Sequence, residues 1–553
     1  MQPTRKLPGL LLGALVAALL PAPGASAAEA DTPEVFRFHG GGYDQAAAMT
    51  VDDAGNVYIG GAVDSTVTEV TFAVVKLSPT GAVRWTAHYN GSLGGVGGSA
   101  LAVAVDAAGN VYAAGSIADG DFYPNFDYLV VAFTTDGTQR WAHRFNGPGD
   151  NFDRATEIAV DDTTGAVYTS GTSYTASPNF TFDWSTRKFS ATGQPLWERR
   201  HPGTGTTADR VADMVLAPDG NVVVSGITRN LDNAWANDFG TVTYDVAGNV
   251  VWDRRWNTTA PGNGFPRDME IDPVGRITIT GTVGDFPPSP VTLRYDRSGT
   301  LLQTIHDGGG SSVDVDGAGN FYLAGSAPDP TGSSFLARYD SSGTRIWATS
   351  VSVGGDEAFH TVFARADSTG AVTAAGTIRN ILVHNDDYLV VRFAPDGREL
   401  WRFRFNGPIG GDDRVAGLSV DSTDTAIVTG TSWNDYLSNR GGTADDIVTL
   451  RFAAADVPPL LAPTSLLATG ISRSQIQLTW TDNAGTEDGF RIERCQGTGC
   501  ADFALIATVG HDVTSHTDQG LARNTRYSYR VQAFNDAGGS DYSNVATGKT
   551  RQR

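Results

Sequence analysis

The sequence lacks the short motifs by which many enzymes and metalloproteins are recognised. It contains no H-x-x-x-H spacing, no G-x-S-x-G elbow, no P-loop and no EF-hand loop. The segment Asp314–Asn320 is acidic like a calcium loop, but it lacks the downstream Glu and coincides with a hairpin turn of the repeat described below. We therefore predict no metal site and no cofactor, and zinc catalysis has no support.

Long apolar runs and positive charge are also scarce. The one extended apolar stretch, Leu7–Leu20, follows Arg5 and Lys6 and precedes Ala25-Ser-Ala27, which predicts a signal peptide over 1–27 that is cleaved near Ala27. No later run reaches the roughly 18 apolar residues of a membrane span. The 40 Lys and Arg stand against 61 Asp and Glu, which argues against nucleic acid or anionic membranes as partners. We expect a secreted, extracellular protein.

Glycine is abundant, with 66 residues, and it punctuates a repeat. Asp127–Asp161 and Asp387–Asp421 agree at about half of their positions. A unit of about 55 residues recurs eight times, and each unit holds four strand-like runs separated by Gly turns. One small sheet cannot bury both of its faces alone, so the units must pack against one another.

This repeat predicts an all-β, eight-bladed β-propeller over residues 34–455, with an open β-solenoid as the alternative. The eighth unit stops after its third run and lacks the Trp-type fourth run. Val35–Gly40 is similar to Arg402–Gly407, which is a fourth run. We therefore predict that the N-terminal strand completes the eighth blade and leaves no unpaired sheet edge.

A second, smaller domain follows the repeats. Pro458, Pro459 and Pro463 mark a linker over 456–462. Residues 463–550 resemble a fibronectin type III domain, a β-sandwich, because Gln477-Leu-Thr-Trp480 supplies a buried Trp and Leu521–Tyr527 has the tyrosine-corner spacing. Cys495 and Cys500 lie in one hexapeptide, and in an exported protein we predict a disulfide between them.

Two recurring residue types are interpreted as structural. A Trp stands four residues after a turn Gly in most units, and its repetition favours packing between blades over stacking on sugars. An Asp recurs seven residues before the end of several first strands, and we interpret it as a cap of the strand entry; the alternative is a ring of acidic and basic groups that faces a ligand. These residues are Trp85, Trp141, Trp197, Trp252, Trp347 and Trp401, and Asp44, Asp153, Asp209 and Asp413. Gln303 replaces the Trp in the fifth unit.

Aromatic residues that do not repeat are the better candidates for ligand binding. They lie in or beside the variable loops after the second strands, where a rigid scaffold usually carries its sites. The alternative is that they only pack their own loops. The candidates are Tyr123, Phe126, Tyr174, Trp184, Trp235, Trp433 and Tyr436.

Two family resemblances bear on function. Val51-Asp-Asp-Ala-Gly-Asn-Val-Tyr58 and Val105-Asp-Ala-Ala-Gly-Asn-Val-Tyr112 resemble the bacterial secreted β-propeller repeat known as SBBP, which implies an exported propeller and no particular reaction. Asp245–Trp252 looks like the Trp-docking motif of quinoprotein dehydrogenases, but an adjacent Cys pair is absent.

These observations lead to two hypotheses about function. The first is a non-catalytic binding or adhesion protein at the cell surface or outside the cell, whose propeller loops take a polysaccharide or protein ligand. The second is a secreted enzyme, either a polysaccharide hydrolase or lyase or a quinoprotein-like dehydrogenase, with its site in the propeller channel. A pair of channel carboxylates at glycosidase separation would support the second.

Overall fold

The computed structural model describes residues 33–552, apart from short internal segments such as 90–96, 230–236, 435–443 and 454–461. The predicted signal peptide lies outside the described residues. Strands account for all the regular structure that is described, so the expected all-β class is confirmed. Within the described ranges no helix is long and apolar enough to cross a membrane.

Eight antiparallel sheets of four strands occupy the first part of the chain. The first strands of sheets 1 to 8, in chain order, are β2 (Gln45–Val51), β6 (Gly98–Val105), β10 (Arg154–Asp161), β14 (Arg210–Leu216), β18 (Gly264–Ile271), β22 (Gly309–Val315), β26 (Glu357–Ala366) and β30 (Asp413–Val420). The second strands are β3 (Val57–Asp64), β7 (Val111–Asp119), β11 (Ala166–Tyr174), β15 (Val222–Arg229), β19 (Ile277–Val283), β23 (Phe321–Ser326), β27 (Val372–Asn380) and β31 (Ala426–Asn434).

The third and fourth strands complete each sheet in sequence order. The third strands are β4 (Val70–Leu77), β8 (Asn125–Phe133), β12 (Phe182–Phe189), β16 (Asn237–Tyr244), β20 (Ser289–Tyr295), β24 (Ser334–Tyr339), β28 (Asn385–Phe393) and β32 (Ala444–Phe452). The fourth strands of sheets 1 to 7 are β5 (Val83–Tyr89), β9 (Gln139–Phe145), β13 (Pro195–His201), β17 (Val250–Trp256), β21 (Leu301–Ile305), β25 (Arg345–Val351) and β29 (Glu399–Phe405).

The N-terminal strand completes sheet 8. β1 (Glu34–Phe38) pairs antiparallel with β32, with Phe36 opposite Thr449, although more than 400 residues separate the two strands in sequence. The predicted pairing of the chain's first strand with its last unit is therefore confirmed.

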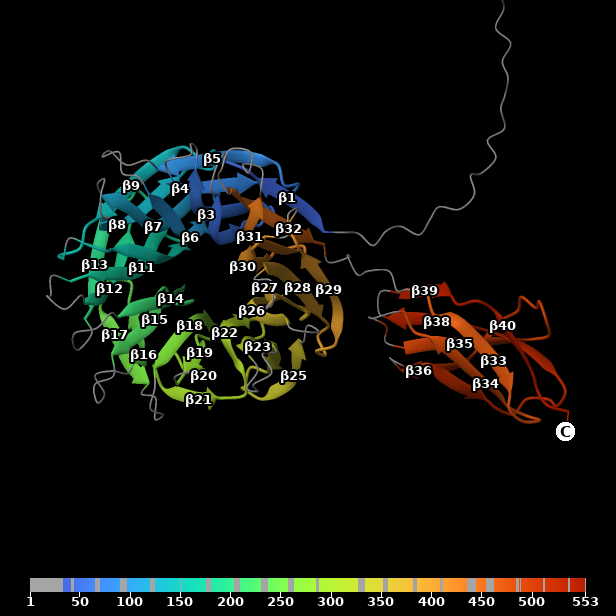
Figure 1. Ribbon diagram of the computed structural model, residues 1–553. Coiled ribbons are helices and arrows are strands. Elements are labelled where there is room, and N and C mark those ends of the chain that lie inside the picture. The colour runs from blue at the N-terminus through green and yellow to red at the C-terminus, as the bar shows by residue number, and fades with distance from the viewer. Residues whose placement is uncertain are drawn as a thin grey trace, which may run out of the picture.

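Each sheet contacts the next through its first strand. These contacts run from β2 to β6 and onward in chain order to β30, and β30 contacts β2. Figure 1 shows the same succession, with the first strands toward the centre and fourth strands such as β5, β13 and β29 on the outside. We call the contact between sheets 8 and 1 the eighth junction, because it joins the two ends of the repeat.

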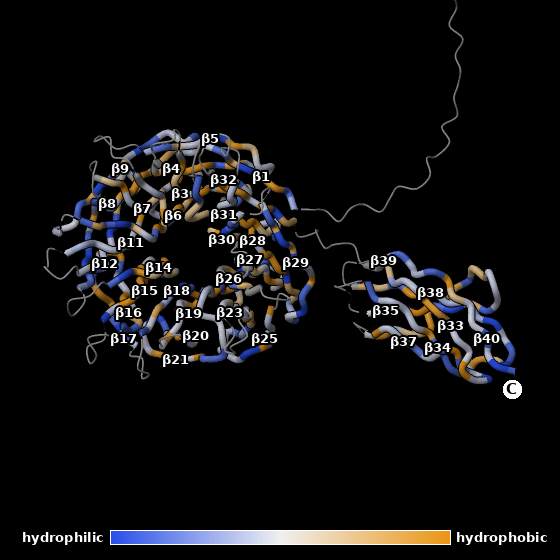
Figure 2. Tube along the Cα trace, viewed as in Figure 1, coloured by the Kyte–Doolittle hydropathy of each residue, from blue (hydrophilic) through white to orange (hydrophobic). Residues whose placement is uncertain are grey.

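The sheets bury their core between neighbours. Tyr112, Val130 and Ala132 of sheet 2 pack with Val167 and Phe189 of sheet 3, for example. Figure 2 shows hydrophobic residues along strands such as β15 and more hydrophilic ones along the outer strand β29. Burial of this kind requires neighbouring sheets, as the repeat predicts.

The C-terminal part of the chain folds as two further sheets. One contains β33 (Thr464–Gly470), β34 (Ile476–Thr481) and β37 (Ser515–Asp518). The other contains β35 (Gly489–Gln496), β36 (Ala504–Gly510), β38 (Arg526–Asn535) and β39 (Gly538–Tyr542), and β40 (Ala546–Lys549) also pairs with β38. Trp480 is buried in their shared core, and the Tyr527 hydroxyl accepts a hydrogen bond from the Ala522 amide at 3.1 Å, as a tyrosine corner requires.

Candidate functional site

The repeated tryptophans pack between sheets, as predicted. Trp252 in sheet 4 lies against the ring of Tyr295 in sheet 5, and its indole N–H donates to the Arg297 carbonyl at 3.0 Å. A Cβ added to Gly299 would lie 2.6 Å from the Trp252 ring, so this position accommodates only glycine. Trp85, Trp197 and Trp347 donate in the same way to a carbonyl two residues before a turn Gly of the next sheet.

Two junctions replace the Trp with another residue. Gln303 donates its side-chain amide to the Gly343 carbonyl at 3.1 Å, so a hydrogen bond stands in for ring packing between sheets 5 and 6. At the eighth junction, Phe36 of β1 lies over Gly81 of sheet 1. The similarity of Val35–Gly40 to Arg402–Gly407 places Phe36 at the position of Phe403, not of Trp401, so the sequence did not predict that Phe36 would take the place of the Trp.

The repeated aspartates cap strand entries, as the structural interpretation predicts. Asp153 is buried and accepts from the Gly147 amide at 2.7 Å and the Tyr174 amide at 2.9 Å. Asp413 accepts from the Gly407 amide at 2.6 Å. Burial raises the pKa of Asp413 to about 6, against which the hydrogen bonds from Ser432 and Gly407 act. These carboxylates therefore stabilise the turn between consecutive sheets.

The structure separates the predicted aromatic residues into three groups. Tyr123, Trp235 and Tyr436 lie outside the described residues. Trp184 is completely buried and stacks on His201, and Tyr174 is buried against Phe182, so neither ring has a face for a ligand. Phe126 is half-buried and packs edge-on against Phe152.

Trp433 is the one predicted aromatic among the described residues that is both exposed and beside a pocket. It lies near the end of β31 and keeps 37% of its surface exposed. A pocket of about 330 Å³ opens beside it, at the eighth junction. It is lined by Gln45, Ala46, Asp412, Arg414, Val415, Ala416, Thr431, Trp433 and Asp445.

The pocket joins β30, β31 and β32 of sheet 8 to β2 of sheet 1, which is distant from them in the sequence. Trp433 and Asp445 face each other across the pairing of β31 with β32, and Gln45 begins β2 in sheet 1. The Gln45 side chain donates to Asp445 at 3.2 Å, and the Arg414 guanidinium donates to Asp412 at 3.2 Å. The Ala46 amide donates to the Thr431 hydroxyl at 3.1 Å, which fixes sheet 1 against sheet 8.

The pocket therefore combines one exposed indole ring with carboxylate, amide and guanidinium groups. Asp412 and Asp445 bring two negative charges and Arg414 brings one positive charge, so the pocket is negative overall. Gln45 and Asp445 hold each other in place from different strands, and Arg414 pairs with Asp412 beside the start of β30, which keeps these polar atoms in fixed positions around the ring. The chemistry suits a ligand with an apolar face and several hydroxyl groups.

A second group of polar side chains lies on the first strands of sheets 3 to 6. Every first strand has a β-bulge at the same place, and the residue after the bulge is acidic in sheets 3, 4 and 5 but Ala, Ser, Phe or Gly in the others. We call Glu157, Asp213, Asp268, Glu270 and Asp314 the inner carboxylates; Glu270 and Asp314 lie two residues further along their strands.

Three of these carboxylates connect consecutive sheets. Asp213 accepts from the Met269 amide at 2.6 Å, Asp268 from the Val313 amide at 2.8 Å, and Asp314 from the Ala366 amide at 2.7 Å. Each acceptor belongs to one sheet and each amide to the next. The oxygen that makes this bond is therefore committed to structure.

Burial and mutual repulsion shift the acidity of this group. Burial, together with the charge of Asp268, raises the pKa of Glu157 to about 8. Burial raises the pKa of Glu270 to about 7 against the opposing charge of Arg365, and burial raises the pKa of Asp213 well above its usual range. Sequence reasoning missed this group, although acidic residues three positions before the end of the first run in units three to five were a visible signal.

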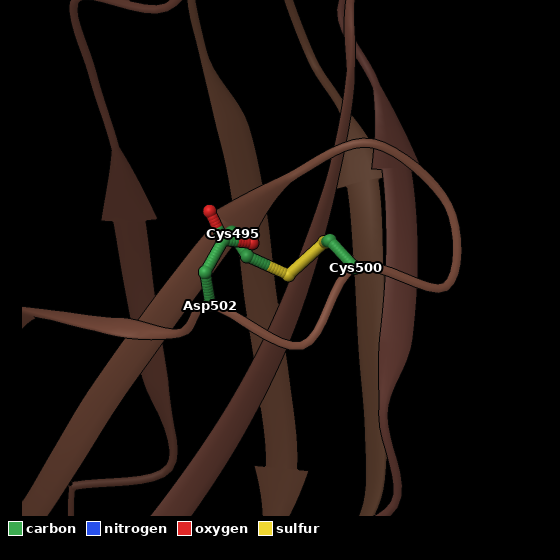
Figure 3. Close-up of side chains that lie close together, drawn as sticks. All are labelled: Cys495, Cys500 and Asp502. Atoms are coloured by element: carbon green, nitrogen blue, oxygen red, sulfur yellow. A yellow bond between two sulfur atoms is a disulfide. The ribbon is translucent and has the colours of Figure 1, made fainter.

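Two groups of side chains lie close enough for metal ligation within the described part of the chain. The first is Cys495, Cys500 and Asp502. Cys495 and Cys500 form the predicted disulfide, and Figure 3 shows Asp502 beside it, so the two sulfur atoms bond to each other and not to a metal. The second is His39, Asp44 and Asp446, at the eighth junction.

Comparison with known proteins identifies the C-terminal part of the chain. A family model described as "Fibronectin type III domain" matches residues 461–549. An amylopullulanase of Thermoanaerobacterium saccharolyticum is 32% identical over 117 residues, which are 20% of this chain and 9% of that protein. Human contactin-2 is 33% identical over 117 residues, which are 20% of this chain and 11% of that protein.

Among solved structures, a fibronectin type III-like protein from Clostridium thermocellum is 27% identical, over 17% of this chain and 95% of that one, with a TM-score of 0.15. The chain thus matches only about a tenth of the length of its curated relatives. The resemblance inferred from Trp480 and the tyrosine corner is confirmed, and residues 461–549 form a fibronectin type III domain.

Proposed function

We propose that this is an exported, non-catalytic binding protein whose pocket at the eighth junction takes a polysaccharide. The observation that carries the proposal is the position of Trp433, an exposed indole surrounded by Gln45, Asp412 and Asp445. Aromatic rings bind the apolar faces of sugar rings, while amide and carboxylate groups bind their hydroxyls. A pocket of about 330 Å³ is at the small end of the range for ligand sites, which suits one end or one short stretch of a glycan chain.

The charge of the pocket limits the class of polysaccharide. Asp412 and Asp445 outnumber Arg414, and the whole chain carries a net charge of −21. Acidic polysaccharides would be repelled, because like charges brought together at a binding surface cost free energy. Neutral or amino-sugar chains fit this pocket better than uronic acid chains do.

The architecture behind this proposal is an eight-bladed β-propeller over residues 34–455, joined through 456–462 to the fibronectin type III domain. Its support is the sequence repeat, the succession of sheet contacts from β2 to β30 and back to β2, and the pairing of β1 with β32. In such a fold the loops at one rim carry the ligand site on a rigid scaffold. Trp433, Asp412 and Gln45 all lie at strand ends on that rim.

Export is supported by the N-terminal sequence and by the second domain. The predicted signal peptide and the Cys495–Cys500 disulfide agree on an oxidising compartment. Fibronectin type III domains are typical of extracellular and surface proteins. One relative that shares the domain is an amylopullulanase, whose name denotes a polysaccharide substrate. We propose that the domain displays the propeller or provides a protein contact.

The proposal is tested with an array of neutral, amino-sugar and acidic glycans, probed with the mature chain and with Trp433→Ala. Exposed Tyr542 lies in the other domain, so Tyr542→Ala is the matched control for loss of a surface ring. We expect binding to neutral or amino-sugar glycans that falls at least tenfold with Trp433→Ala and is unchanged with Tyr542→Ala, since one well-placed ring contributes about 1.4 kcal/mol or more. Binding that survives Trp433→Ala would overturn the assignment of the pocket.

The inner carboxylates favour a second candidate function, an exported enzyme acting on polysaccharide. Hydrolysis of a glycosidic bond needs one carboxyl group that is protonated near neutral pH and one that is ionised. The raised pKa of Glu157, about 8, suits the first role. Turnover of any glycan that binds, lost in Glu157→Gln while binding is retained, would establish this function; binding without turnover supports the first.

A further inference from the structure

His39 lies between two buried carboxylates where the N-terminal strand joins the ends of the repeat. Its Nδ1 is 2.8 Å from Asp446 Oδ1 and 3.9 Å from Asp44 Oδ2. Asp44 and Asp446 are almost completely buried, whereas the His39 side chain keeps 36% of its surface exposed. His39 follows β1, Asp44 precedes β2 and Asp446 lies in β32, and their ligand atoms all lie within 4.8 Å of one another.

The other junctions supply a structural comparison for this group. Arg144 pairs with Asp127, and Arg404 pairs with Asp387, just as Arg37 pairs with Asp446 at 3.7 Å. Asp153 and Asp413 bind the amides of Gly147 and Gly407, just as Asp44 binds that of Gly40. The carboxylates are therefore part of the repeat.

His39 is the departure from that repeat. Phe38-His39-Gly40 corresponds to Phe145-Asn146-Gly147 and to Phe405-Asn406-Gly407. An Asn side chain is sufficient for the structural role at two junctions, so an imidazole is not needed to hold the turn. What imidazole adds is a strong ligand for transition metals.

The two oxygens of Asp446 face different side chains. Arg37 is near Oδ2 of Asp446, while His39 is near Oδ1. Two carboxylates and one arginine carry a net charge of −1, so a bound divalent ion would leave a net charge of only +1 at the site. One nitrogen and two oxygen ligands, with one side open to solvent, is a ligand set that zinc accepts in proteins.

We propose that His39, Asp44 and Asp446 form a structural site for a divalent transition-metal ion of the zinc class. The ion would connect β1 to the start of β2 and to β32, and so fasten the N-terminal strand to both ends of the repeat. Motif spacing in the sequence does not reveal such a site, because Asp446 lies about 400 residues from His39 and Asp44. The proposal is independent of glycan binding at the Trp433 pocket.

The test uses the mature full-length chain after removal of metals with a chelator. Titration with zinc, followed by calorimetry and by elemental analysis of the dialysed protein, should give one zinc per chain. Zinc at about 100 times its Kd should favour the folded state by about a factor of 100, seen as a rise in Tm. Calcium should give no comparable rise, because imidazole is a poor ligand for it.

His39→Asn is the decisive variant, because it gives this junction the residue that Asn146 and Asn406 provide elsewhere. We expect the metal-free variant to keep the Tm of the metal-free parent, and its zinc affinity to fall more than about tenfold. His516→Asn, in the other domain, is the matched control and should bind zinc like the parent. Absence of stoichiometric zinc in the parent, or zinc binding that is unchanged in His39→Asn, would overturn the proposal.

Discussion

The junctions within the repeat and the eighth junction both hold one sheet against the next, but they use different residues to do so. Within the repeat a buried or half-buried Trp packs on a turn Gly of the next sheet, as Trp252 does on Gly299. At the eighth junction Phe36 takes that place, and the same junction holds the Trp433 pocket and the His39 group. Repetition thus marks residues that serve packing, and the eighth junction, where the two ends of the repeat meet, combines several departures from it.

The largest expected effect is the loss of a repeated Trp. Trp252 is buried and belongs to the core between sheets 4 and 5. Trp252→Ala should lower the free energy of unfolding by about 3–5 kcal/mol, because it removes a large ring and leaves a cavity. Chemical denaturation measures this, with Gln303→Ala as the comparison at the junction that has no Trp. Equal losses for the two variants would contradict the role assigned to the indole.

The glycines under these rings offer a more selective test of the same contact. Gly299 and Gly275 both have a positive φ, of 77° and 88°. A Cβ on Gly299 would lie 2.6 Å from Trp252, whereas one on Gly275 would meet only Arg297 Cβ at 3.4 Å. Both alanine variants incur about 1 kcal/mol of backbone cost, but Gly299→Ala should lose about 1–3 kcal/mol more from the clash. Equal losses of stability would show that φ alone requires the glycine.

The inner carboxylates should make the stability of the middle junctions depend on pH. The folded pKa of Glu157, about 8, lies above its ordinary value of 4.5, so its contribution to stability is complete below about pH 4.5 and is lost as the pH rises through 8. Asp268, Asp213 and Glu270 are the neighbouring acids, and Arg365 is the nearby cation. The free energy of unfolding of the parent should therefore fall from pH 5 to pH 9.

Glu157→Gln should remove the part of this fall in stability at high pH that comes from Glu157. The variant should match the parent near pH 5 and exceed it by about 1–3 kcal/mol at pH 9, since each pKa unit corresponds to about 1.4 kcal/mol and the site keeps some solvent contact. Denaturation of both proteins across this pH range is the measurement. A variant whose stability runs parallel to that of the parent at every pH would show that Glu157 ionises normally.

Most of the fold could be predicted from the sequence, because the same turn and packing residues recur along the repeat. Gly turns, a V-D pair and a Trp recur in most units, so the four strands of each sheet and the pairing of β1 with β32 could be inferred from comparing the units with one another. The fibronectin type III domain followed from Trp480 and Tyr527. These are local patterns, and local patterns are what a single sequence shows.

The site was less accessible to sequence reasoning because it forms between distant segments. Trp433 was named from its place beside a variable loop, but Trp184 satisfied the same criterion and is completely buried. Nothing in the order of residues shows that Gln45 lies beside Asp445, or His39 beside Asp446. Those contacts exist only once β1 and β2 meet the last sheet.

The smallest expected effect on stability completes the comparison of the two kinds of Trp. Trp433→Ala should change the free energy of unfolding by less than about 1 kcal/mol, because Trp433 keeps 37% of its surface exposed beside an open pocket and its loss leaves no closed cavity. The same substitution should remove glycan binding, whereas Trp252→Ala should reduce stability and leave the pocket intact in the molecules that remain folded. Calorimetry and glycan affinity measured on both variants check the contrast. A large loss of stability in Trp433→Ala would place this ring with the repeated tryptophans as a packing residue and would remove the main support for a binding site at the eighth junction.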